Sequence, residues 1–242
     1  MKTVLITGAS SGIGYQLAKD YAQDGWNVIA CGRNSAKLES LSGVHGNICV
    51  LMFDATDKAQ TLEALSCLAD IDLIILNAGT CEYIDKGRID VDLFKRVFDI
   101  NLFGLLNCIE ALQDSFTHKT HLALMGSTAA YLGLPRAEAY GASKAAVAYL
   151  AKSLAVDLER KGVFVSLISP GFVKTPLTDK NDFAMPMLIS PEQASLEIRQ
   201  GLAKRKSEVH FPRKFSYFLK MLSTLPSSMQ IALVKKMTRK TQ

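Results

Sequence analysis

The sequence predicts an α/β fold in which one parallel sheet carries helices on both faces. Short apolar runs alternate with amphipathic stretches, and turn residues bound each run. A glycine-rich segment, Thr7 to Gly14, directly follows the first apolar run. Such alternation is typical of doubly wound sheets, which bind ligands at the carboxyl ends of their strands. We therefore expect a single domain over residues 1–242, with its functional site along that edge.

Several apolar runs have the length and bounding turn residues expected of strands. They are Thr3 to Thr7, Asn27 to Cys31, Ile48 to Phe53, Leu73 to Asn77, His121 to Ser127, Val163 to Ser169 and a short one at Glu208 to Phe211. The segments between them repeat apolar residues at helical spacing, as Leu62, Leu65 and Ala69 do. Strands that alternate with helices in this way predict parallel pairing.

Composition sets further limits on the class of protein. A chain of 242 residues that is 48% hydrophobic can bury one large core. The cysteines show no Cys-x-x-Cys spacing and no clustered histidines accompany them, so we expect buried thiols in a reducing compartment and no metal site. They are Cys31, Cys49, Cys67, Cys81 and Cys108. His118 and His121 are expected in a solvated turn. The short apolar opening predicts no signal peptide, and no run is long enough to span a membrane, which favours a cytoplasmic protein.

The net charge of +5 is unevenly distributed. Residues 203–242 hold ten basic residues and one acid, Glu208, a local charge of +9 that leaves −4 on the rest of the chain. A basic segment can mark a nucleic-acid partner, but no recognition helix, zinc finger or aromatic ribonucleoprotein motif accompanies these charges. We therefore do not expect nucleic-acid binding.

The glycine-rich segment Thr7-Gly8-Ala9-Ser10-Ser11-Gly12-Ile13-Gly14 joins the first predicted strand to a helix. Glycines there permit a tight turn and let the backbone approach a pyrophosphate, which the helix N-terminus stabilises. In isolation the segment is equally consistent with a permissive β-turn, but its place between strand and helix favours a nucleotide. No Gly-Lys-Ser/Thr follows, as it does in ATP-binding loops, so a dinucleotide is expected.

The end of the second predicted strand indicates which dinucleotide binds. An NAD site normally places an acid about twenty residues beyond the glycines, where it binds the ribose 2′-hydroxyl. The segment here is Cys31-Gly32-Arg33-Asn34, which contains no acid. Gly32 leaves room for a 2′-phosphate, and Arg33 offers a guanidinium to pair with it, so NADP is favoured. The alternative is an ordinary solvated arginine at a strand end.

Tyr140 and Lys144 stand four residues apart, thirteen residues after Ser127. Positions i and i+4 share one face of a helix, so an ammonium would lie beside a phenol and favour the phenolate. The ordinary pKa of tyrosine is about 10, and we expect Lys144 to lower it toward neutrality, as a general acid or base requires. Taken alone, this spacing more often marks an aromatic ring covered by a lysine stem.

Several motifs follow one another in a fixed order. They are Gly8-x-x-x-Gly12-x-Gly14, Asn77-Ala78-Gly79, Asn101, Ser127, Tyr140-x-x-x-Lys144 and Pro170-Gly171 with Thr175. Over about residues 1–200, this order and spacing resemble the single-domain type of the short-chain dehydrogenase/reductase family. The resemblance implies a Rossmann-type fold and an NADP(H)-dependent oxidoreductase that interconverts a carbonyl and an alcohol. NAD(H) is the less favoured cofactor.

The resemblance also implies catalytic roles for Asn101, Ser127, Tyr140 and Lys144. Hydride that arrives at a carbonyl carbon leaves negative charge on oxygen, and Tyr140 would supply the proton. Ser127 would donate a hydrogen bond to the same oxygen. Lys144 would anchor the nicotinamide ribose, and Asn101 would support a water that relays protons to the lysine.

Further positions are implied to bind the cofactor. They are Gly8, Ser10, Ser11, Gly12, Ile13, Gly14, Arg33, Asp54, Asn77, Ala78, Gly79, Tyr140, Lys144, Pro170, Gly171, Val173 and Thr175. Asp54 would touch the adenine, Asn77 to Gly79 would line the adenosine ribose and brace the central strand, and Thr175 would hold the nicotinamide carboxamide. The family also implies a homodimer or homotetramer, in which the helices bearing Asn101 and the Tyr-Lys pair pack between subunits.

Residues 172–190 form the longest stretch without a clear element, and loops of this length are often lids. Its apolar residues, together with Tyr131, Leu132 and Leu134, predict an apolar substrate pocket. They are Phe172, Val173, Phe183, Met185, Met187, Leu188 and Ile189. This pattern does not choose among 3-oxoacyl groups, ketones, aldehydes, steroids and sugars.

Residues 212–242 predict basic amphipathic helices. The first repeats Phe215, Phe218, Leu219, Leu222 and Leu225 beside Arg213, Lys214 and Lys220, and the second begins at Pro226 and carries Met229, Leu233, Met237, Lys235, Lys236 and Arg239. Such helices can lie on anionic membranes. Packing over the substrate pocket or against another subunit is the favoured alternative, since any packed helix is amphipathic.

Two other classes of function deserve weight beside the enzyme. A non-catalytic NADP-binding sensor or scaffold protein would share the glycine-rich segment, but the intact Ser127, Tyr140 and Lys144 argue against it. An epimerase or dehydratase acting on a nucleotide sugar would share the tyrosine and lysine. Such relatives usually carry a larger C-terminal substrate domain, for which this chain is too short.

Overall fold

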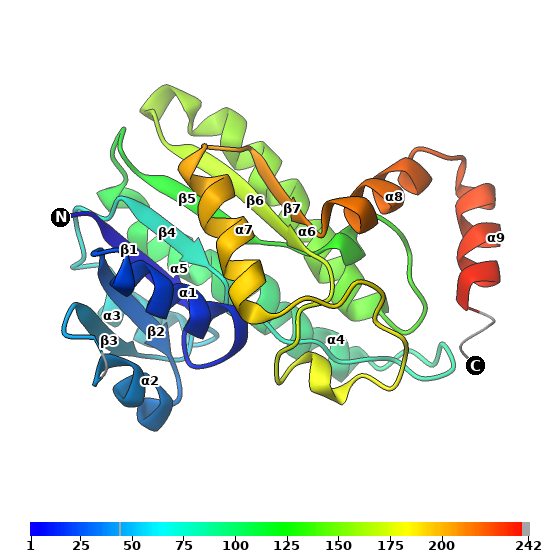
Figure 1. The fold of residues 1–242 in the computed structure, drawn as a ribbon, viewed down its shortest axis with the longest axis horizontal. Coiled ribbons are helices and arrows are strands. Elements are labelled where there is room, and N and C mark those ends of the chain that lie inside the picture. Colours follow the sequence, from blue (N-terminus) through cyan, green and yellow to red (C-terminus); the bar gives the residue numbers. More distant parts are fainter. Residues whose placement is uncertain (44, 239–242) are drawn as a thin grey trace.

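A computed structural model describes residues 1–43 and 45–238, and its seven strands form one parallel sheet in the order β3-β2-β1-β4-β5-β6-β7 (Figure 1). The strands are β1 (Thr3–Thr7), β2 (Asn27–Gly32), β3 (Ile48–Met52), β4 (Leu73–Leu76), β5 (His121–Met125), β6 (Phe164–Pro170) and β7 (Glu208–Phe211). The predicted fold class is confirmed, and each strand begins and ends within two residues of its predicted bounds.

Helices cover both faces of the sheet. They are α1 (Gly12–Gln23), α2 (Ser35–Ser42), α3 (Lys58–Leu65), α4 (Val91–Phe98), α5 (Gly104–Leu112), α6 (Glu138–Asp157), α7 (Pro191–Ala203), α8 (Arg213–Ser223) and α9 (Ser227–Thr238). In Figure 1, α1 and α7 lie in front of the sheet and α5 and α6 behind it. The apolar core is correspondingly double, with one cluster under α1, α2 and α7 and another under α3, α5 and α6.

The alternation of side chains along the strands explains this double core. In β1, Val4 and Ile6 belong to the cluster under α1 and α7, whereas Leu5 belongs to the cluster under α5 and α6. All three side chains are fully buried. Successive residues of a strand point to opposite faces, so a sheet covered on both sides needs the continuous apolar runs seen in the sequence.

The strand order places the site. From β1 the chain builds the sheet outward through β2 and β3, and then returns to pair β4 on the other side of β1. The loops that leave β1 and β4 therefore diverge, and a crevice opens at the carboxyl ends of these two strands. Thr7 ends β1 there, and Asn77 directly follows β4.

Some sequence-based expectations are wrong. Helix α3 ends at Leu65, so Ala69 lies in the following loop. Cys49 and Cys67 are exposed, because Cys49 faces outward on the edge strand β3 and Cys67 lies in the turn after α3. His121 is buried in β5, where its Nε2 lies 2.8 Å from Ser166 Oγ. Burial lowers the pKa of His121 to about 4.

The segment 172–190 is pinned at both ends. Val173 and Ile189 form an isolated parallel bridge, and both pack against the cluster under α1 and α7. Between them, Thr178–Lys180 forms one 3-10 turn. Met187 and Leu188 are exposed, at 52% and 41% of their surface. The apolar residues of the segment therefore divide between the core and solvent.

Helices α8 and α9 lie at the end of the molecule opposite the N-terminus (Figure 1). Leu219 and Leu222 of α8 are buried against Leu132, in the loop that follows β5. Only Val234 is buried among the α9 residues. Residues 239–242, with Arg239 of the expected second helix, lie outside the described part of the chain.

A polar network fastens α8 to the sheet. Lys220 Nζ donates to Glu208 Oε2 over 2.6 Å, and Ser169 Oγ donates to Glu208 Oε1 over 3.1 Å. The Tyr131 hydroxyl donates to the same Glu208 oxygen. Within the described residues, no helix combines the length and apolar character needed to cross a membrane.

Candidate active site

The glycine-rich loop is packed against the end of β4. Gly8 has a φ of +68°, a conformation that residues with a Cβ rarely adopt. A Cβ on Gly14 would lie 2.3 Å from the carbonyl oxygen of Gly8 and 2.5 Å from Asn77 Nδ2. Only glycine at these positions lets the first turn of α1 sit directly on the loop.

Thr7 joins the ends of β1 and β4. Its Oγ1 accepts hydrogen bonds from the backbone nitrogens of Asn77 (3.0 Å) and Ala78 (3.1 Å). The Asn77 side chain donates to the carbonyl oxygen of Thr7 over 3.0 Å. The amide of Asn77 therefore braces the central strands, as the sequence predicts, and the following residues are held open toward the crevice.

A cleft of about 550 Å³ occupies this crevice. Its lining includes many of the expected cofactor-binding residues, namely Gly8, Ser10, Ser11, Gly12, Ile13, Arg33, Asp54, Asn77, Ala78, Gly79 and Thr175. Gly14, Tyr140, Lys144, Pro170, Gly171 and Val173 do not line it. Gly14 lies beneath the loop, and Val173 is 3% exposed within the core.

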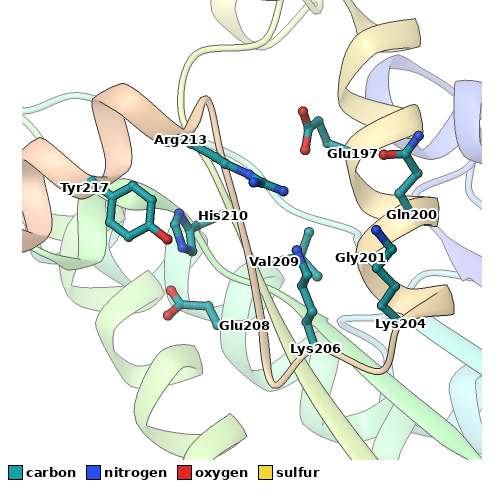
Figure 2. A pocket seen from close by; sticks show the side chains of 10 residues that line it. All are labelled: Glu197, Gln200, Gly201, Lys204, Lys206, Glu208, Val209, His210, Arg213 and Tyr217. Carbon is teal, nitrogen blue, oxygen red and sulfur yellow. The ribbon is translucent and has the colours of Figure 1, made fainter.

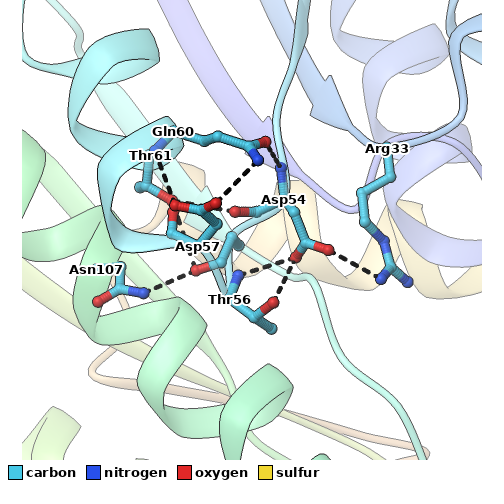
Figure 3. Close-up of polar contacts among 8 residues, drawn as sticks. Arg33, Asp54, Thr56, Asp57, Gln60, Thr61 and Asn107 are labelled. Atoms are coloured by element: carbon cyan, nitrogen blue, oxygen red, sulfur yellow. Dashed lines mark hydrogen bonds and ion pairs between the residues drawn. The ribbon is translucent and has the colours of Figure 1, made fainter.

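Arg33 and Asp54 contact each other at one end of the cleft (Figure 3). The Arg33 guanidinium donates to Asp54 Oδ2 over 3.2 Å. Asp54 Oδ1 also accepts from the Thr56 nitrogen (2.9 Å) and hydroxyl (2.8 Å). Partial burial would raise the pKa of Asp54, but the hydrogen bonds from Thr56 and Arg33 outweigh it and lower this pKa.

Asn101 lies on a π turn, Asp99–Phe103, between α4 and α5. Such turns are rare and recur at functional sites. The Asn101 side chain is fully buried, and it brackets Thr80: Oδ1 accepts from the Thr80 nitrogen (2.7 Å), and Nδ2 donates to the Thr80 carbonyl (3.0 Å). Nδ2 also donates to Ser143 Oγ over 2.9 Å.

Ser143 carries this link to the helix that bears the Tyr-Lys pair. Its hydroxyl donates to the carbonyl oxygen of Tyr140 over 2.7 Å, within the first turns of α6. The loop after β4, the π turn and α6 are thus connected through one asparagine and one serine.

Lys144 stands where the cleft meets α6. Its side chain is buried, and Nζ donates to the carbonyl oxygen of Met125 over 2.8 Å. A Cβ on Gly79, a residue of the cleft lining, would lie 3.4 Å from Lys144 Nζ and 3.1 Å from Asn101 Oδ1. Burial lowers the pKa of Lys144 to about 8.

Tyr140 and Ser127 face each other beside Lys144. Burial raises the pKa of Tyr140 to about 12, nearby Cys81 adds to the rise, and a hydrogen bond with the Ser127 side chain opposes it. Ser127 Oγ also accepts from the nitrogen of Ala129 over 3.1 Å. The expectation that Lys144 lowers the pKa of Tyr140 is wrong in this structure. Burial of the phenol dominates, and the ammonium lies 5.9 Å from the ring centroid with one proton directed to Met125.

Aromatic side chains extend from the segment 172–190 toward the loop after β4. Phe183 makes an edge contact with Tyr83, with 5.3 Å between ring centroids, and Phe172 lies 6.1 Å from Phe183. Phe172 also lies 5.9 Å from Phe215 at the start of α8. These rings connect α8, the expected lid and the loop that follows the cleft.

Arg136 also connects the segment 172–190 to the loop after β4 through ion pairs. Its guanidinium forms ion pairs with Asp182 (2.6 Å) and Asp85 (3.0 Å) and lies 5.5 Å from the centroid of the Tyr83 ring. Arg136 follows β5, whereas Asp182 belongs to the segment 172–190 and Asp85 to the loop after β4. One arginine therefore ties three loops together.

Several of these residues were not predicted from the sequence. Thr7, Thr80, Ser143 and Tyr83 contact residues that were predicted, and Arg136 forms an ion pair with Asp182 of the expected lid. Thr7 and Ser143 adjoin recognised motifs, and this adjacency was the available signal. The contacts of Tyr83 and Arg136 join distant segments and have no local pattern.

A second cavity, of about 250 Å³, opens between α7, β7 and α8 (Figure 2). Its lining is mostly polar and comprises Glu197, Gln200, Gly201, Lys204, Lys206, Glu208, Val209, His210, Arg213 and Tyr217. Arg213 extends from the start of α8 toward α7 (Figure 2). The cavity shares no lining residue with the cleft at the glycine-rich loop.

Comparison with known proteins agrees with this geometry. Residues 2–185 match the profile of the short chain dehydrogenase family. An uncharacterized oxidoreductase of Myxococcus xanthus is 33% identical over 238 residues, which cover 93% of each chain.

Two solved structures share the fold. A short-chain dehydrogenase from Sphingobium yanoikuyae in complex with NADPH is 24% identical, with a TM-score of 0.80 and 88% of each chain covered. A short-chain dehydrogenase/reductase from Burkholderia phymatum in complex with NAD is 20% identical, with a TM-score of 0.81 over 90% of this chain and 92% of that one. The chain belongs to the short-chain dehydrogenase/reductase family, and is accordingly an oxidoreductase.

Proposed function

We propose that this protein is an NADP(H)-dependent oxidoreductase that interconverts a carbonyl and an alcohol on an apolar substrate. One observation carries the proposal. The cleft at the glycine-rich loop includes Gly79 in its lining, and a Cβ on Gly79 would lie 3.4 Å from Lys144 Nζ and 3.1 Å from Asn101 Oδ1. A dinucleotide lying along the cleft would bring its reactive ring to the buried group of Ser127, Tyr140 and Lys144.

The residues present fit such a cofactor. Gly8 and Gly14 leave the backbone of the loop bare at the N-terminus of α1, which suits a pyrophosphate. Arg33 and Asp54 lie at the adenosine end, and Thr175 lines the opposite side of the cleft near Gly12. When bound, the dinucleotide supplies the hydride and, in its oxidised form, a positive charge.

Tyr140 serves as the acid in the reductive direction. With a pKa of about 12 it keeps its proton at neutral pH, so it can donate to an oxygen that gains negative charge. Ser127 hydrogen-bonds Tyr140 and can donate its own proton to the same substrate oxygen. Lys144, whose Nζ donates to the carbonyl oxygen of Met125, would anchor the nicotinamide ribose beside this pair.

Asn101 has a positioning role in this proposal. Its three hydrogen bonds fix the distance between Thr80 and Ser143. Thr80 follows Gly79 in the cleft lining, and Ser143 precedes Lys144. The cofactor end of the site and the proton-donating end therefore keep their alignment. The water relay to Lys144 that the family resemblance implies would run beside these hydrogen bonds of Asn101.

NADP is preferred over NAD on the strength of Gly32 and Arg33. The fold accommodates either cofactor, since the two solved neighbours hold one of each. Here Gly32 lines the cleft, and 66% of the Arg33 side chain is exposed, so the guanidinium is accessible to a 2′-phosphate. Asp54 competes for it, because Arg33 already donates to that carboxylate.

Apolar substrates are favoured by the walls of the site. Tyr83, Phe172 and Phe183 form contacting rings between the loop after β4 and the segment 172–190, and Leu132 lies in the loop after Ser127. We also propose a homo-oligomer in which α5 and α6 pack between subunits. Phe103, Tyr149 and Val156 are 53%, 77% and 71% exposed beside or on these helices, which is unusual for large apolar residues on a solvated face.

Turnover with a panel of carbonyl substrates tests the proposal. We expect NADPH oxidation with at least one apolar ketone or aldehyde, faster than with NADH, and a fall in kcat of roughly 100-fold or more for Tyr140→Phe. NADPH binding by this variant, followed by fluorescence, should be unchanged. Binding of NADPH without turnover of any substrate would instead support a sensor or scaffold.

A further inference from the structure

Helix α8 is apolar on two faces. Its inner face buries Leu219 and Leu222 against Leu132, which accounts for the amphipathic pattern of the sequence. Its outer face also carries large apolar side chains: Tyr217 is 59% exposed, Phe218 41% and Met221 60%. At about 100° per residue, Tyr217 and Met221 lie on the side of the helix opposite Leu219, and Phe218 lies between that side and the buried one. Packing within the protein therefore does not explain the outer face.

Helix α9 continues this exposure. Met229 is 49% exposed, Ile231 56% and Met237 45%, while only Val234 of the helix is buried. The tail surface, defined as the exposed side chains of α8 and α9, thus gathers six large apolar residues within 21 positions of the chain. Large apolar side chains that gather in one part of a surface often mark an interaction site.

The charged groups on the tail surface have one sign. Arg213, Lys214, Lys235 and Lys236 are exposed, and no ion pair is formed by any of the four among the residues described. Glu208, the single acid of residues 203–242, is engaged by Lys220, Tyr131 and Ser169. A partner that covers this surface must therefore be both apolar and anionic.

The second cavity adds cations at the edge of the same surface. Lys204, Lys206 and Arg213 line it beside Tyr217, which belongs to the outer face of α8 (Figure 2). Glu197 and Glu208 also line the cavity, so the excess of positive charge there is smaller than the cations alone suggest. Anionic headgroups next to the apolar face would meet basic side chains in this position.

We propose that the tail surface docks the protein on an anionic phospholipid bilayer, with α8 and α9 lying in the plane of the interface. Aromatic and methionine side chains of α8 enter the acyl boundary, and the lysines contact the headgroups, as in other interfacial helices. The inner face of the same helix reaches the expected lid through Phe215 and Phe172, so docking places the substrate entrance next to the lipid phase. Vesicle binding requires no turnover, so this proposal stands apart from the proposed oxidoreductase activity.

Co-sedimentation of the full chain with vesicles tests the proposal. We expect binding to phosphatidylcholine vesicles that contain 30% phosphatidylserine, and much weaker binding to pure phosphatidylcholine. Each cation near an anionic surface contributes about 1 kcal/mol, so neutralising and reversing three of them in Lys214→Glu/Lys235→Glu/Lys236→Glu should lower the partition coefficient on the order of 100-fold. Phe218→Ser/Met221→Ser should lower it at least about tenfold, because apolar area is lost.

A charge-matched variant separates docking from net charge. Lys37, Lys119 and Lys161 are exposed and lie on other parts of the surface, so Lys37→Glu/Lys119→Glu/Lys161→Glu changes the net charge equally. The control should bind nearly as well as the wild type. Thermal unfolding of all variants should be unchanged within a few degrees, since each altered side chain is exposed.

Three outcomes would overturn the proposal. One is failure of the wild type to sediment with the phosphatidylserine vesicles. Another is an equal loss of binding in the control and in the tail variant, which would indicate a general charge effect. The third is a dimer that Phe218→Ser/Met221→Ser dissociates, together with vesicle binding that these substitutions leave intact, since the apolar face would then belong to a second copy of the chain.

Discussion

The guanidinium of Arg33 donates a 3.2 Å hydrogen bond to the carboxylate of Asp54 at the adenosine end of the cleft. The sequence predicts each residue as a cofactor contact, but not their pairing. The pairing matters because a 2′-phosphate would have to share Arg33 with a carboxylate whose pKa is already lowered by Thr56 and Arg33. Asp54 therefore sets how much of the Arg33 charge is available to the cofactor.

Substitution of this pair should change cofactor preference in opposite directions. Arg33→Ala should raise the KM for NADPH on the order of tenfold and leave the KM for NADH unchanged, because one charge-assisted contact is lost. Asp54→Asn should lower the KM for NADPH by removing the competing charge. Steady-state kinetics with both cofactors checks the prediction, and an Arg33→Ala effect of equal size on NADH would contradict it.

Removal of the Asn101 side chain should destabilise the protein and misalign the site. Asn101→Ala leaves the partly buried backbone groups of Thr80 without side-chain partners, which should cost about 2 kcal/mol. Ser143→Ala, the matched control, removes the two hydrogen bonds of one hydroxyl but leaves both contacts of Asn101 with Thr80, so it should cost less. Urea unfolding measures the first effect, and kcat at saturating cofactor measures the second. Equal stability of the two variants would show that Asn101 does not bracket Thr80.

The contacts of Arg136 should restrain the segment 172–190. Exposed ion pairs contribute at most about 1 kcal/mol each, so Arg136→Ala should increase proteolytic cleavage within residues 176–190 several-fold without unfolding the protein. Arg136→Lys should restore only part of the protection, because it loses the planar fork that contacts two carboxylates and a ring. Protection in the wild type should also fall with added salt. Cleavage rates that change neither with the Arg136 substitutions nor with added salt would contradict this restraint.

His121 should make the folded state sensitive to acid. Ser166 Oγ donates its proton to the carbonyl of Lys206 (2.6 Å), so the neutral imidazole of His121 must donate from Nε2. Its folded pKa of about 4 lies below the unfolded value of 6.5, so the unfolded chain binds more protons between these values. Stability is therefore full above pH 6.5 and is lost as the pH falls, by about 2 kcal/mol at pH 5. Urea unfolding at pH 7 and pH 5 measures this loss, which His121→Gln should largely remove.

Most of the fold follows from local patterns in the sequence. Each strand is a short apolar run between turn residues, and burial on both faces requires such runs, so strand bounds could be predicted within two residues. The family resemblance likewise predicted many of the residues that line the cleft, but not all of those it named do so. The interpretation of 1–242 as a single domain remains a prediction.

The contacts that organise the site could not be predicted from local patterns in the sequence. Asn101 and Ser143 are 42 positions apart, and their hydrogen bond depends on how a π turn and α6 pack. The π turn itself shifts backbone hydrogen bonds without a residue signature. The sequence predicts a lowered pKa for Tyr140, but burial raises this pKa, and burial is a property of the folded structure. His121 was misplaced because its partner, Ser166, lies on another strand.

The network around Glu208 limits how the tail can be studied. Lys220 of α8 supplies one of the hydrogen bonds that satisfy this carboxylate, and Tyr131 and Ser169 supply others from the loop after β5 and from β6. Cutting the chain before α8 would leave an acid that is only 27% exposed without its cation, and would uncover Leu132. A truncated protein would therefore differ from the full chain at the substrate entrance as well as at its surface. Point substitutions on the outer face of α8 are the cleaner means of separating what the tail contacts from what it supports.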